Sequence, residues 1–251
     1  MNLILLFPNE INNNLVTLRD RRSQHISTIL KSRAGDTVRI GIINGPTGSG
    51  RVLTVSGQEV VLEITADGPV PPKPLTDLIL ALPRPIMLKR VLAQAAALGV
   101  GRIFLINANR VEKSFFSATM VKQSDFKEHL IHGLEQGMDT RLPEISIHER
   151  FRPFSEDLLP VIINDYPVRL IAHPEGNRYL FDAAPRPADQ RALLAIGPEG
   201  GWVDFEVEKF KAQGLILFSM GPRILRVDSA VPALLSQIDL LRRMTAKQPC
   251  V

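Results

Sequence analysis

The residues best suited to chemistry lie in two loops that each follow an apolar run of the chain. Leu193–Ile196 leads into the loop Gly197–Gly201, and Leu215–Met220 leads into the loop Gly221–Arg226. Apolar runs of this length that end at glycine and proline are typical of buried strands, because proline cannot continue the hydrogen-bonded ladder. The sequence therefore predicts two glycine loops at the ends of two core strands.

These loops are suited to binding and polarising a ligand rather than to supplying a nucleophile. They offer backbone amides, glycines that admit a ligand closely, the carboxylate of Glu199 and the guanidinium of Arg226. The chain contains no GxSxG nucleophile elbow and no HExxH zinc motif, and its one cysteine is Cys250, beside the C-terminus. A cofactor that brings its own reactive group fits such loops.

The segments around the two loops repeat one pattern of strand, loop and helix. Asp204 is placed to cap a short helix that Gly214 ends, and a longer helix is expected at Ala230–Arg243. Such a repeat is typical of a parallel α/β sheet, in which ligands bind beyond the carboxyl ends of the strands. Both loops are therefore expected at one edge of the same sheet.

The preceding part of the chain extends this sheet. A strand at Asp77–Leu82, a helix at Ile86–Leu98 and a strand at Arg102–Asn107 form a βαβ unit, which implies parallel pairing. Val168–Ala172 is a third buried-strand candidate, and it ends at His173-Pro174. A helix at 124–136 and a strand at 142–147 are also expected.

Taken together, the two loops resemble those of one protein family. The sequence IGPEGG at 196–201, followed by GPRILR at 221–226 and an acidic residue, Asp228, is similar to the bacterial 16S rRNA uridine-N3 methyltransferases of the SPOUT superfamily. The resemblance covers nearly the whole chain, although Pro85 stands where a glycine is common in the family.

The resemblance implies both a fold and a reaction. The fold is a trefoil-knotted α/β domain with a parallel sheet, forming a homodimer with active sites near the subunit interface. The reaction is methylation of N3 of a uridine in small-subunit (16S) ribosomal RNA, with S-adenosylmethionine as cofactor. The residues implied to bind this cofactor are His173, Pro174, Ile196, Gly197, Gly200, Gly201, Met220, Gly221, Ile224, Leu225 and Arg226.

Three ionisable residues are the candidates for catalysis of this reaction. Neutral uridine carries a proton on N3, which must leave before N3 attacks a methyl group. Arg226 is expected to stabilise the charge that develops on the uracil carbonyls. Either Asp228 or Glu199 is expected to take the proton, and the sequence does not choose between them. Asp228 also has a structural alternative, as the cap of the helix at Ala230–Arg243.

The segment Arg226–Ser229 departs from the family pattern. Many relatives have Arg, Thr, Glu and a small residue here, whereas this chain reads Arg-Val-Asp-Ser. This departure is the best support for the alternative function, that of a non-catalytic RNA-binding or ribosome-assembly protein that keeps the fold. A nucleotide-binding oxidoreductase is disfavoured, because no GxGxxG stands between a strand and a helix.

A smaller β-domain is expected before the α/β domain. Thr37–Ile43, Val52–Val55 and Val60–Ile64 are β-branched runs, and the proline-rich segment Ala66–Pro74 is typical of a linker. We therefore divide the chain into residues 1–72 and 73–251. The segment Gln24–Lys31 resembles the N-terminal PUA-like domain of the same family, which implies a small β-barrel that binds RNA.

The basic residues of the first domain are concentrated between Arg19 and Arg39, where six lysines and arginines face two aspartates. Such a local excess suits contact with phosphates, although an ordinary solvated face has the same composition. The residues predicted to bind RNA are Arg21, Arg22, Lys31 and Arg33.

Other features argue against further functions. The net charge of +4 permits a polyanionic partner, and no apolar run approaches a membrane span, so we expect a cytoplasmic protein without membrane contact. His129 and His132 lack a third ligand, so no metal is predicted. The segment Gly45–Val52 matches the outer glycines of a phosphate-binding loop but lacks its lysine and hydroxyl, so we expect a plain hairpin loop.

Overall fold

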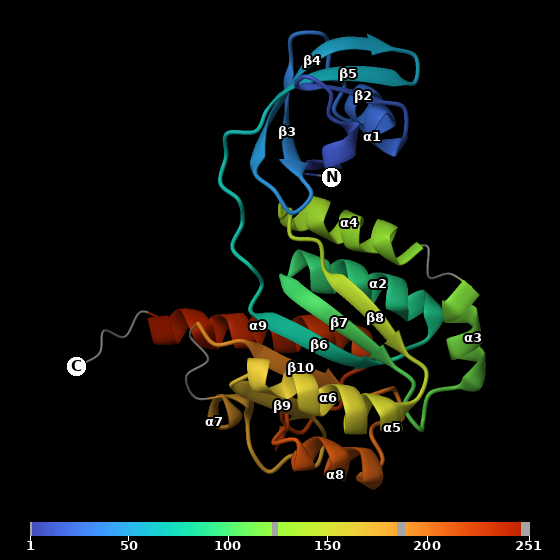
Figure 1. Cartoon of the computed structure of the whole chain (residues 1–251), viewed down its shortest axis with the longest axis vertical. Helices are drawn as coiled ribbons and strands as arrows, with labels where there is room; N and C mark the ends of the chain where they lie inside the picture. Colours follow the sequence, from blue (N-terminus) through green and yellow to red (C-terminus); the bar gives the residue numbers. More distant parts are fainter. Residues whose placement is uncertain (1, 122–124, 185–188, 247–251) are drawn as a thin grey trace. The chain divides into compact units, whose positions relative to one another are not determined.

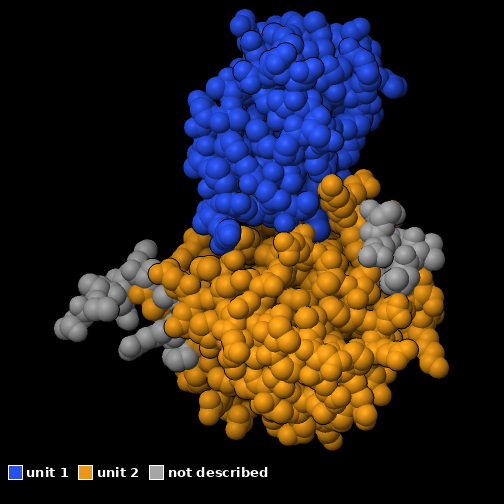
Figure 2. Space-filling model, viewed as in Figure 1, with its two compact units in different colours: residues 1–73, 130–142 blue, residues 74–129, 143–251 orange. Residues whose placement is uncertain are grey.

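The structure is a computed structural model that describes residues 2–121, 125–184 and 189–246. The chain divides into two compact units, which Figure 2 distinguishes by colour. Unit 1 contains residues 1–73 and 130–142, and unit 2 contains residues 74–129 and 143–251. The break at Lys73 lies inside the expected linker. Residues 130–142, in contrast, pack with unit 1 although they follow the first strands of unit 2.

Unit 1 is built on a five-stranded mixed sheet with the strand order β1-β3-β4-β5-β2. β1 pairs with β3 in parallel, and the other neighbours are antiparallel. The strands are β1 (Ile4–Leu6), β2 (Leu15–Leu18), β3 (Thr37–Ile42), β4 (Thr47–Ser56) and β5 (Glu59–Thr65).

The sheet of unit 1 curls around one apolar cluster. β1 and β2 are its two edges, yet Leu6 of β1 and Leu18 of β2 belong to the same buried cluster as Ile40 and Leu62 from the middle strands. The expected hairpin loop at Gly45–Val52 is shorter than predicted, since β4 already begins at Thr47. A Cβ atom at Gly48 would collide with the carbonyl of Thr65, which accounts for glycine inside this strand.

The helical elements of unit 1 follow β1 and β2. They are the 3-10 turn η1 (Pro8–Glu10), α1 (Arg21–Gln24) and the π-helical turn η2 (His25–Ile29). Asp20 caps α1, because its carboxylate accepts a hydrogen bond from the Arg22 amide at 2.9 Å.

Unit 2 contains a six-stranded sheet with the order β11-β9-β10-β6-β7-β8, and every pair of neighbours is parallel. The parallel α/β sheet predicted from the sequence is therefore confirmed. The strands are β6 (Thr76–Ala81), β7 (Val100–Ile106), β8 (Glu144–His148), β9 (Val168–Ala172), β10 (Ala192–Ile196) and β11 (Ile216–Phe218).

Helices cover both faces of this sheet (Figure 1). α9 packs against α2, α7 and β10 on one face, and α8 packs against η4 on the other. None of the described helices is long and apolar enough to cross a membrane. The described helical elements that follow β6 in the chain are α2 (Pro85–Ala97), α3 (Lys113–Val121), α4 (Phe126–Gly137), α5 (Phe151–Pro153), η4 (Phe154–Leu158), α6 (Leu159–Ile162), η5 (Ile163–Asp165), α7 (Leu180–Ala183), α8 (Asp204–Ala212) and α9 (Val227–Ala246). Most of α4 belongs to unit 1.

The central strands of unit 2 are buried on both faces. Every residue of β6 and of β10 is buried. Such strands appear in a sequence as uninterrupted apolar runs, which is why the sequence located them within one or two residues. The expected helix at 124–136 begins at Phe126, and residue 124 lies outside the part of the chain that the structure describes.

One carboxylate is buried at the amino-terminal end of this sheet. Asp77 on β6 has no exposed surface, and its oxygens accept hydrogen bonds from Arg102 Nε at 3.1 Å, Tyr166 Oη at 2.5 Å and Arg191 Nη2 at 2.5 Å. Burial raises the pKa of Tyr166, and the neighbouring Asp77 carboxylate raises it further. A buried charge is tolerated only when it is paired and hydrogen-bonded, as it is here.

Replacing Asp77 is therefore expected to destabilise unit 2. Asp77→Ala should lower the free energy of unfolding by about 2–3 kcal/mol, less than for a fully buried pair because both arginines are partly exposed. Denaturant unfolding measures this loss. Asp165→Ala is the matched control, since the Asp165 carboxylate is mostly exposed and lies 3.6 Å from Arg102 Nη2. Equal losses of unfolding free energy in the two variants would contradict the stabilising role assigned to the buried Asp77 carboxylate.

Candidate functional site

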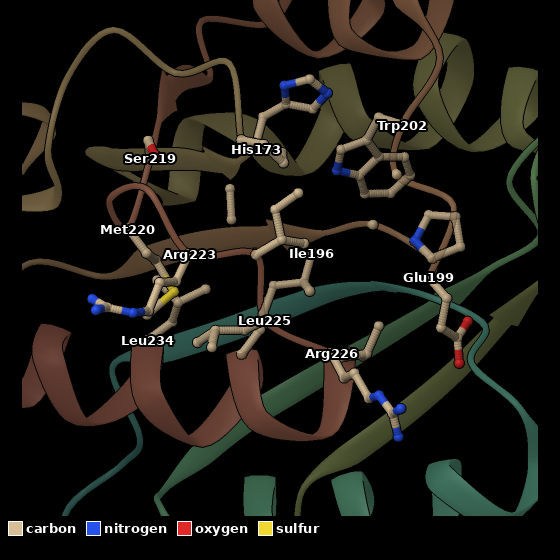
Figure 3. A pocket seen from close by; sticks show the side chains of 18 of the residues that line it. His173, Ile196, Glu199, Trp202, Ser219, Met220, Arg223, Leu225, Arg226 and Leu234 are labelled. Carbon is tan, nitrogen blue, oxygen red and sulfur yellow. The ribbon is translucent and has the colours of Figure 1, made fainter.

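Three loops meet at the carboxyl edge of the unit 2 sheet and enclose a cavity of about 490 Å³. They follow β9, β10 and β11, as parallel pairing requires. Figure 3 shows the cavity with the side chains that surround it. The predicted residues that the structure brings together around this cavity are His173, Pro174, Ile196, Gly197, Glu199, Gly200, Gly201, Met220, Gly221, Ile224, Leu225 and Arg226.

The walls of the cavity are mainly apolar. Ile196 contributes a side chain from the end of β10, Met220 and Leu225 contribute side chains from the loop after β11, and Leu234 contributes one from α9. Ile224, in contrast, is 82% exposed and lies at the mouth. The sequence did not indicate Leu234, because its place in α9 gives no sign that this helix crosses beside the loops.

The glycines of the loops serve different purposes. Gly201 and Gly221 have φ angles of +74° and +115°, which other residues adopt only with strain. A Cβ atom at Gly197 would lie 3.1 Å from Trp202 Nε1, so this glycine makes room for the indole. A Cβ atom at Gly200 would lie 3.2 Å from the side chain of Arg110.

Trp202 is a residue of the cavity that the sequence analysis missed. It is the only tryptophan of the chain, it is 3% exposed, and it packs against Phe210 at a ring-centroid distance of 5.1 Å. Its Nε1 is buried and has no hydrogen-bond partner among the described residues. A buried N–H without a partner is costly unless a ligand accepts its proton. The signal in the sequence was a lone tryptophan directly after Gly201.

Hydrogen bonds hold the loop that follows β10 to the loop that follows β7. Glu206 is 1% exposed, and its carboxylate accepts from the amides of Asn109 at 2.7 Å and Val203 at 3.0 Å. Arg110 Nη1 donates to the carbonyl of Gly200 at 2.5 Å. The expectation that Asp204 caps α8 was wrong, because Glu206 satisfies the amide at the start of the helix.

Two of the candidate catalytic side chains lie at the cavity mouth. Glu199 and Arg226 are both exposed, and Figure 3 shows their charged ends pointing away from the centre of the cavity on the same side. Glu199 Oε1 accepts weakly from the Arg84 amide at 3.5 Å. The Glu199 carboxylate and the Arg226 guanidinium therefore border one part of the mouth. A ligand outside the cavity can meet a ligand bound inside it at this place.

Asp228 is placed differently from the other candidates. α9 begins at Val227, and the amides of Ser229 and Ala230 donate to the carbonyl of Arg226. Asp228 therefore lies in the first turn of the helix, and the prediction that it caps a helix starting at Ala230 was wrong. It does not line the cavity, and its buried Oδ1 has no partner among the described residues.

The predicted RNA-binding residues fall into two groups. Arg22 is 7% exposed, and its guanidinium binds Glu10 at 2.6 Å and Asp20 at 2.7 Å. Burial alone would raise the pKa of Glu10, but hydrogen bonds from Arg22 and from the Phe7 amide lower it below its ordinary value. Arg22 is therefore a structural residue that cannot reach a phosphate, and its prediction as an RNA contact was wrong.

The other three predicted contacts lie nearer the surface of unit 1. Arg21 donates two hydrogen bonds to the carboxylate of Glu135, at 2.8 and 3.1 Å. Lys31 and Arg33 are exposed. Within the described ranges, no cluster of three or more histidine, cysteine or acidic residues is placed to bind a metal.

Comparisons with known proteins agree on one family. Residues 71–239 match the family described as RNA methyltransferase domain. A ribosomal RNA small subunit methyltransferase E from Treponema pallidum is 31% identical, over 93% of this chain and 88% of that protein. A ribosomal RNA small subunit methyltransferase E 1 from Borreliella burgdorferi is 25% identical, over 93% of this chain and 95% of that protein.

The fold is also that of a solved structure. A ribosomal RNA small subunit methyltransferase E from Neisseria gonorrhoeae, in a crystal structure bound to S-adenosyl methionine, has a TM-score of 0.78 at 20% identity. The similarity covers 96% of this chain and 98% of that one. It extends through both units.

The Glu206 carboxylate is expected to hold the two loops together. In Glu206→Gln one oxygen is replaced by an amide group that cannot accept a hydrogen bond, so either the Asn109 or the Val203 amide loses its partner. The free energy of unfolding should fall by about 1–2 kcal/mol. Hydrogen exchange, read at these two amides, should become faster at one of them. Glu208→Gln, on the exposed face of α8, should leave both unchanged, and unchanged exchange in Glu206→Gln would contradict the proposed role.

Proposed function

The chain belongs to the RNA methyltransferase family, and we propose that it methylates N3 of a uridine in small-subunit (16S) ribosomal RNA with S-adenosylmethionine as cofactor. The observation that carries this proposal is the apolar cavity at the carboxyl edge of the sheet, bordered at its mouth by Glu199 and Arg226. The names and coverage of the relatives support the reaction and the substrate.

The residues of the cavity fit the cofactor. A volume of about 490 Å³ lies within the range of small-molecule sites. Ile196, Met220 and Leu225 offer an apolar surface for the adenine ring, and the Trp202 N–H is a donor that the described residues leave unused. His173 and Pro174 border the cavity from the β9 loop, and the glycine loops supply further backbone groups.

When bound, S-adenosylmethionine supplies an electrophilic methyl group, so the chain must orient the uridine and remove its N3 proton. Arg226 favours the uridine anion over neutral uridine, because a guanidinium stabilises charge on the uracil carbonyls. We assign proton removal to Glu199, which borders the cavity mouth. Asp228 lies outside the cavity lining and is instead assigned to the first turn of α9, where an acidic group is favoured by the helix dipole.

Two finer features of the fold belong to the same proposal. We assign a trefoil knot to unit 2, supported by the order of its strands: β10 lies between β9 and β6, while α9 returns from the edge strand β11 to pack against α2. We assign a PUA-like barrel to residues 1–72, supported by the curl of the mixed sheet around one cluster.

The expected partners follow from this function. The protein acts on 16S rRNA or on the small ribosomal subunit in the cytoplasm. We further propose a homodimer, supported by exposed apolar side chains at the cavity mouth and along α9. These are Ile224 at 82%, Leu240 at 56% and Met244 at 59% exposure.

The Trp202 N–H is expected to contribute to cofactor binding. Trp202→Phe keeps an aromatic ring but removes the donor, so the affinity for S-adenosylmethionine measured by calorimetry should fall about 5- to 30-fold. In the wild-type protein the same titration should change the tryptophan fluorescence, because Trp202 is the only tryptophan of the sequence. Equal affinities of the two proteins would remove the indole N–H from the site.

The roles of the charged residues are separated by single-turnover methylation of 16S rRNA. Arg226→Ala should lower the rate about a hundredfold or more, as the loss of one preorganised donor does. Glu199→Gln should lower it by roughly 10²–10⁴ and remove the acid limb of the pH profile. Asp228→Asn, the matched carboxylate outside the cavity, should keep a rate near wild type.

Two outcomes would change the assignment. A slow Asp228→Asn enzyme with a fast Glu199→Gln enzyme would make Asp228 the base. A wild-type protein that binds 16S rRNA and S-adenosylmethionine but transfers no methyl group would favour the non-catalytic alternative.

A further inference from the structure

The six basic residues between Arg19 and Arg39 divide into those bound to acidic side chains and those exposed without an ion pair to a described residue. Arg19 pairs with Glu59 at 2.6 Å, Arg21 with Glu135 at 2.8 Å, and Arg22 with two acidic residues. Lys31, Arg33 and Arg39 are exposed, and none of them forms an ion pair with a described side chain. The nearest acidic group in sequence, Asp36, accepts a hydrogen bond from the Arg33 backbone amide at 2.8 Å.

Lys31, Arg33 and Arg39 lie on or next to the segments that line one cavity. A hollow of about 420 Å³ lies beside β1 and β3, lined entirely by residues of unit 1. Leu3, Ile4 and Val38 border it with side chains that are almost fully buried, so Leu30, 45% exposed, supplies most of its apolar surface. The polar side chains that line it are Asn2, Ser32, Thr37 and Arg39.

The backbone at Lys31 is in an unusual conformation. Its φ angle is +55°, in the left-handed region where glycine is preferred and another residue costs about 1–2 kcal/mol. The turn closes the helical segment before it, since the Leu30 amide donates to His25 and the Ser32 amide donates to Ile26. Strain of this kind is retained at functional positions more often than elsewhere. Here it places a lysine between two residues, Leu30 and Ser32, that line the hollow.

We propose that this hollow binds one unpaired nucleotide of the RNA, with the base inside it and the flanking phosphates on Lys31, Arg33 and Arg39. The proposal rests on the proposed function, because it names a contact of the same RNA substrate. The exposed Leu30 side chain offers an apolar surface for the face of a base, and the Ser32 and Thr37 hydroxyls can bond its edge. Asn2 also lines the hollow, where its side-chain amide donates to the carbonyl of Gln136 at 3.3 Å. Arg39 adds a planar guanidinium, on which bases stack.

A single strand suits this surface better than the two other polyanions that a basic patch can attract. Double-stranded RNA is held through its backbone and 2′-hydroxyls, and its paired bases cannot enter a hollow. An acidic peptide would use the cations but has no flat apolar group to cover Leu30. The combination of cations, hydrogen-bonding groups and the exposed Leu30 side chain at one hollow therefore favours an unstacked base.

Fluorescence anisotropy with the full chain and an unstructured single-stranded 12-nucleotide RNA tests the electrostatic part. Lys31→Gly and Arg39→Ala should each weaken binding about fivefold at 0.1 M salt and reduce the log–log salt slope by roughly 0.7. Lys31→Gly relieves the left-handed strain, so weaker binding by this variant does not reflect unfolding. Arg19→Ala removes the same charge from an existing ion pair and should leave the slope unchanged.

An abasic strand of the same length tests the insertion of a base. It should bind at least about fivefold more weakly than the intact strand, with an unchanged salt slope, because stacking is lost while the phosphates remain. Calorimetry with S-adenosylmethionine should give the same affinity for Lys31→Gly and wild type, which separates this site from the cofactor site. Equal affinities for the intact and abasic strands would overturn the proposal. Equal affinities for the single strand and for a duplex of the same sequence would also overturn it, as would displacement of the RNA by a polyglutamate peptide at matched charge.

Discussion

Parallel pairing of six strands is the constraint on which the candidate site depends. Because all six strands run in one direction, their carboxyl ends lie at one edge, and the loops after β9, β10 and β11 meet there. The opposite edge is fixed by the buried carboxylate of Asp77, which ties β6 to Arg102 on β7 and to Tyr166 and Arg191. The sheet is held at the amino-terminal ends of its strands, and the loops at the carboxyl ends can therefore adopt irregular backbone conformations. These loops include two glycines with positive φ.

Hydrogen bonds between loops hold the backbone around the cavity in place. Glu206 joins the loop after β7 to the start of α8, and Arg110 holds the carbonyl of Gly200. Such contacts fix the backbone before a ligand arrives, so less binding energy is spent on ordering it. The Trp202 N–H in the cavity has no partner among the described residues, and the mouth carries the exposed charges of Glu199 and Arg226. This division of an apolar interior from a charged mouth is what a reaction between a bound cofactor and a large polyanion requires.

The sequence predicted the elements that are determined locally. β9 was located to the residue, and β6, β7 and β10 within two residues, because strands buried on both faces appear as continuous apolar runs. It failed where a residue's role depends on a distant partner. The sequence shows Arg22 as one more basic residue, whereas the structure pairs it with Glu10. The sequence also does not show that the missing Cβ of Gly197 makes room for Trp202. Glu206 and the packing of residues 130–142 with unit 1 also depend on contacts between separate segments.

The central claim is that this chain methylates a uridine of 16S rRNA at N3. The most direct measurement is nucleoside mass spectrometry of 16S rRNA taken from cells that lack the protein and then incubated with the purified chain and S-adenosylmethionine. Chromatographic standards separate 3-methyluridine from its isomers of equal mass. The account predicts that 3-methyluridine appears at one site and only when both protein and cofactor are present. RNA that gains no methyl group, or that gains it on another base or another ring atom, would contradict the account.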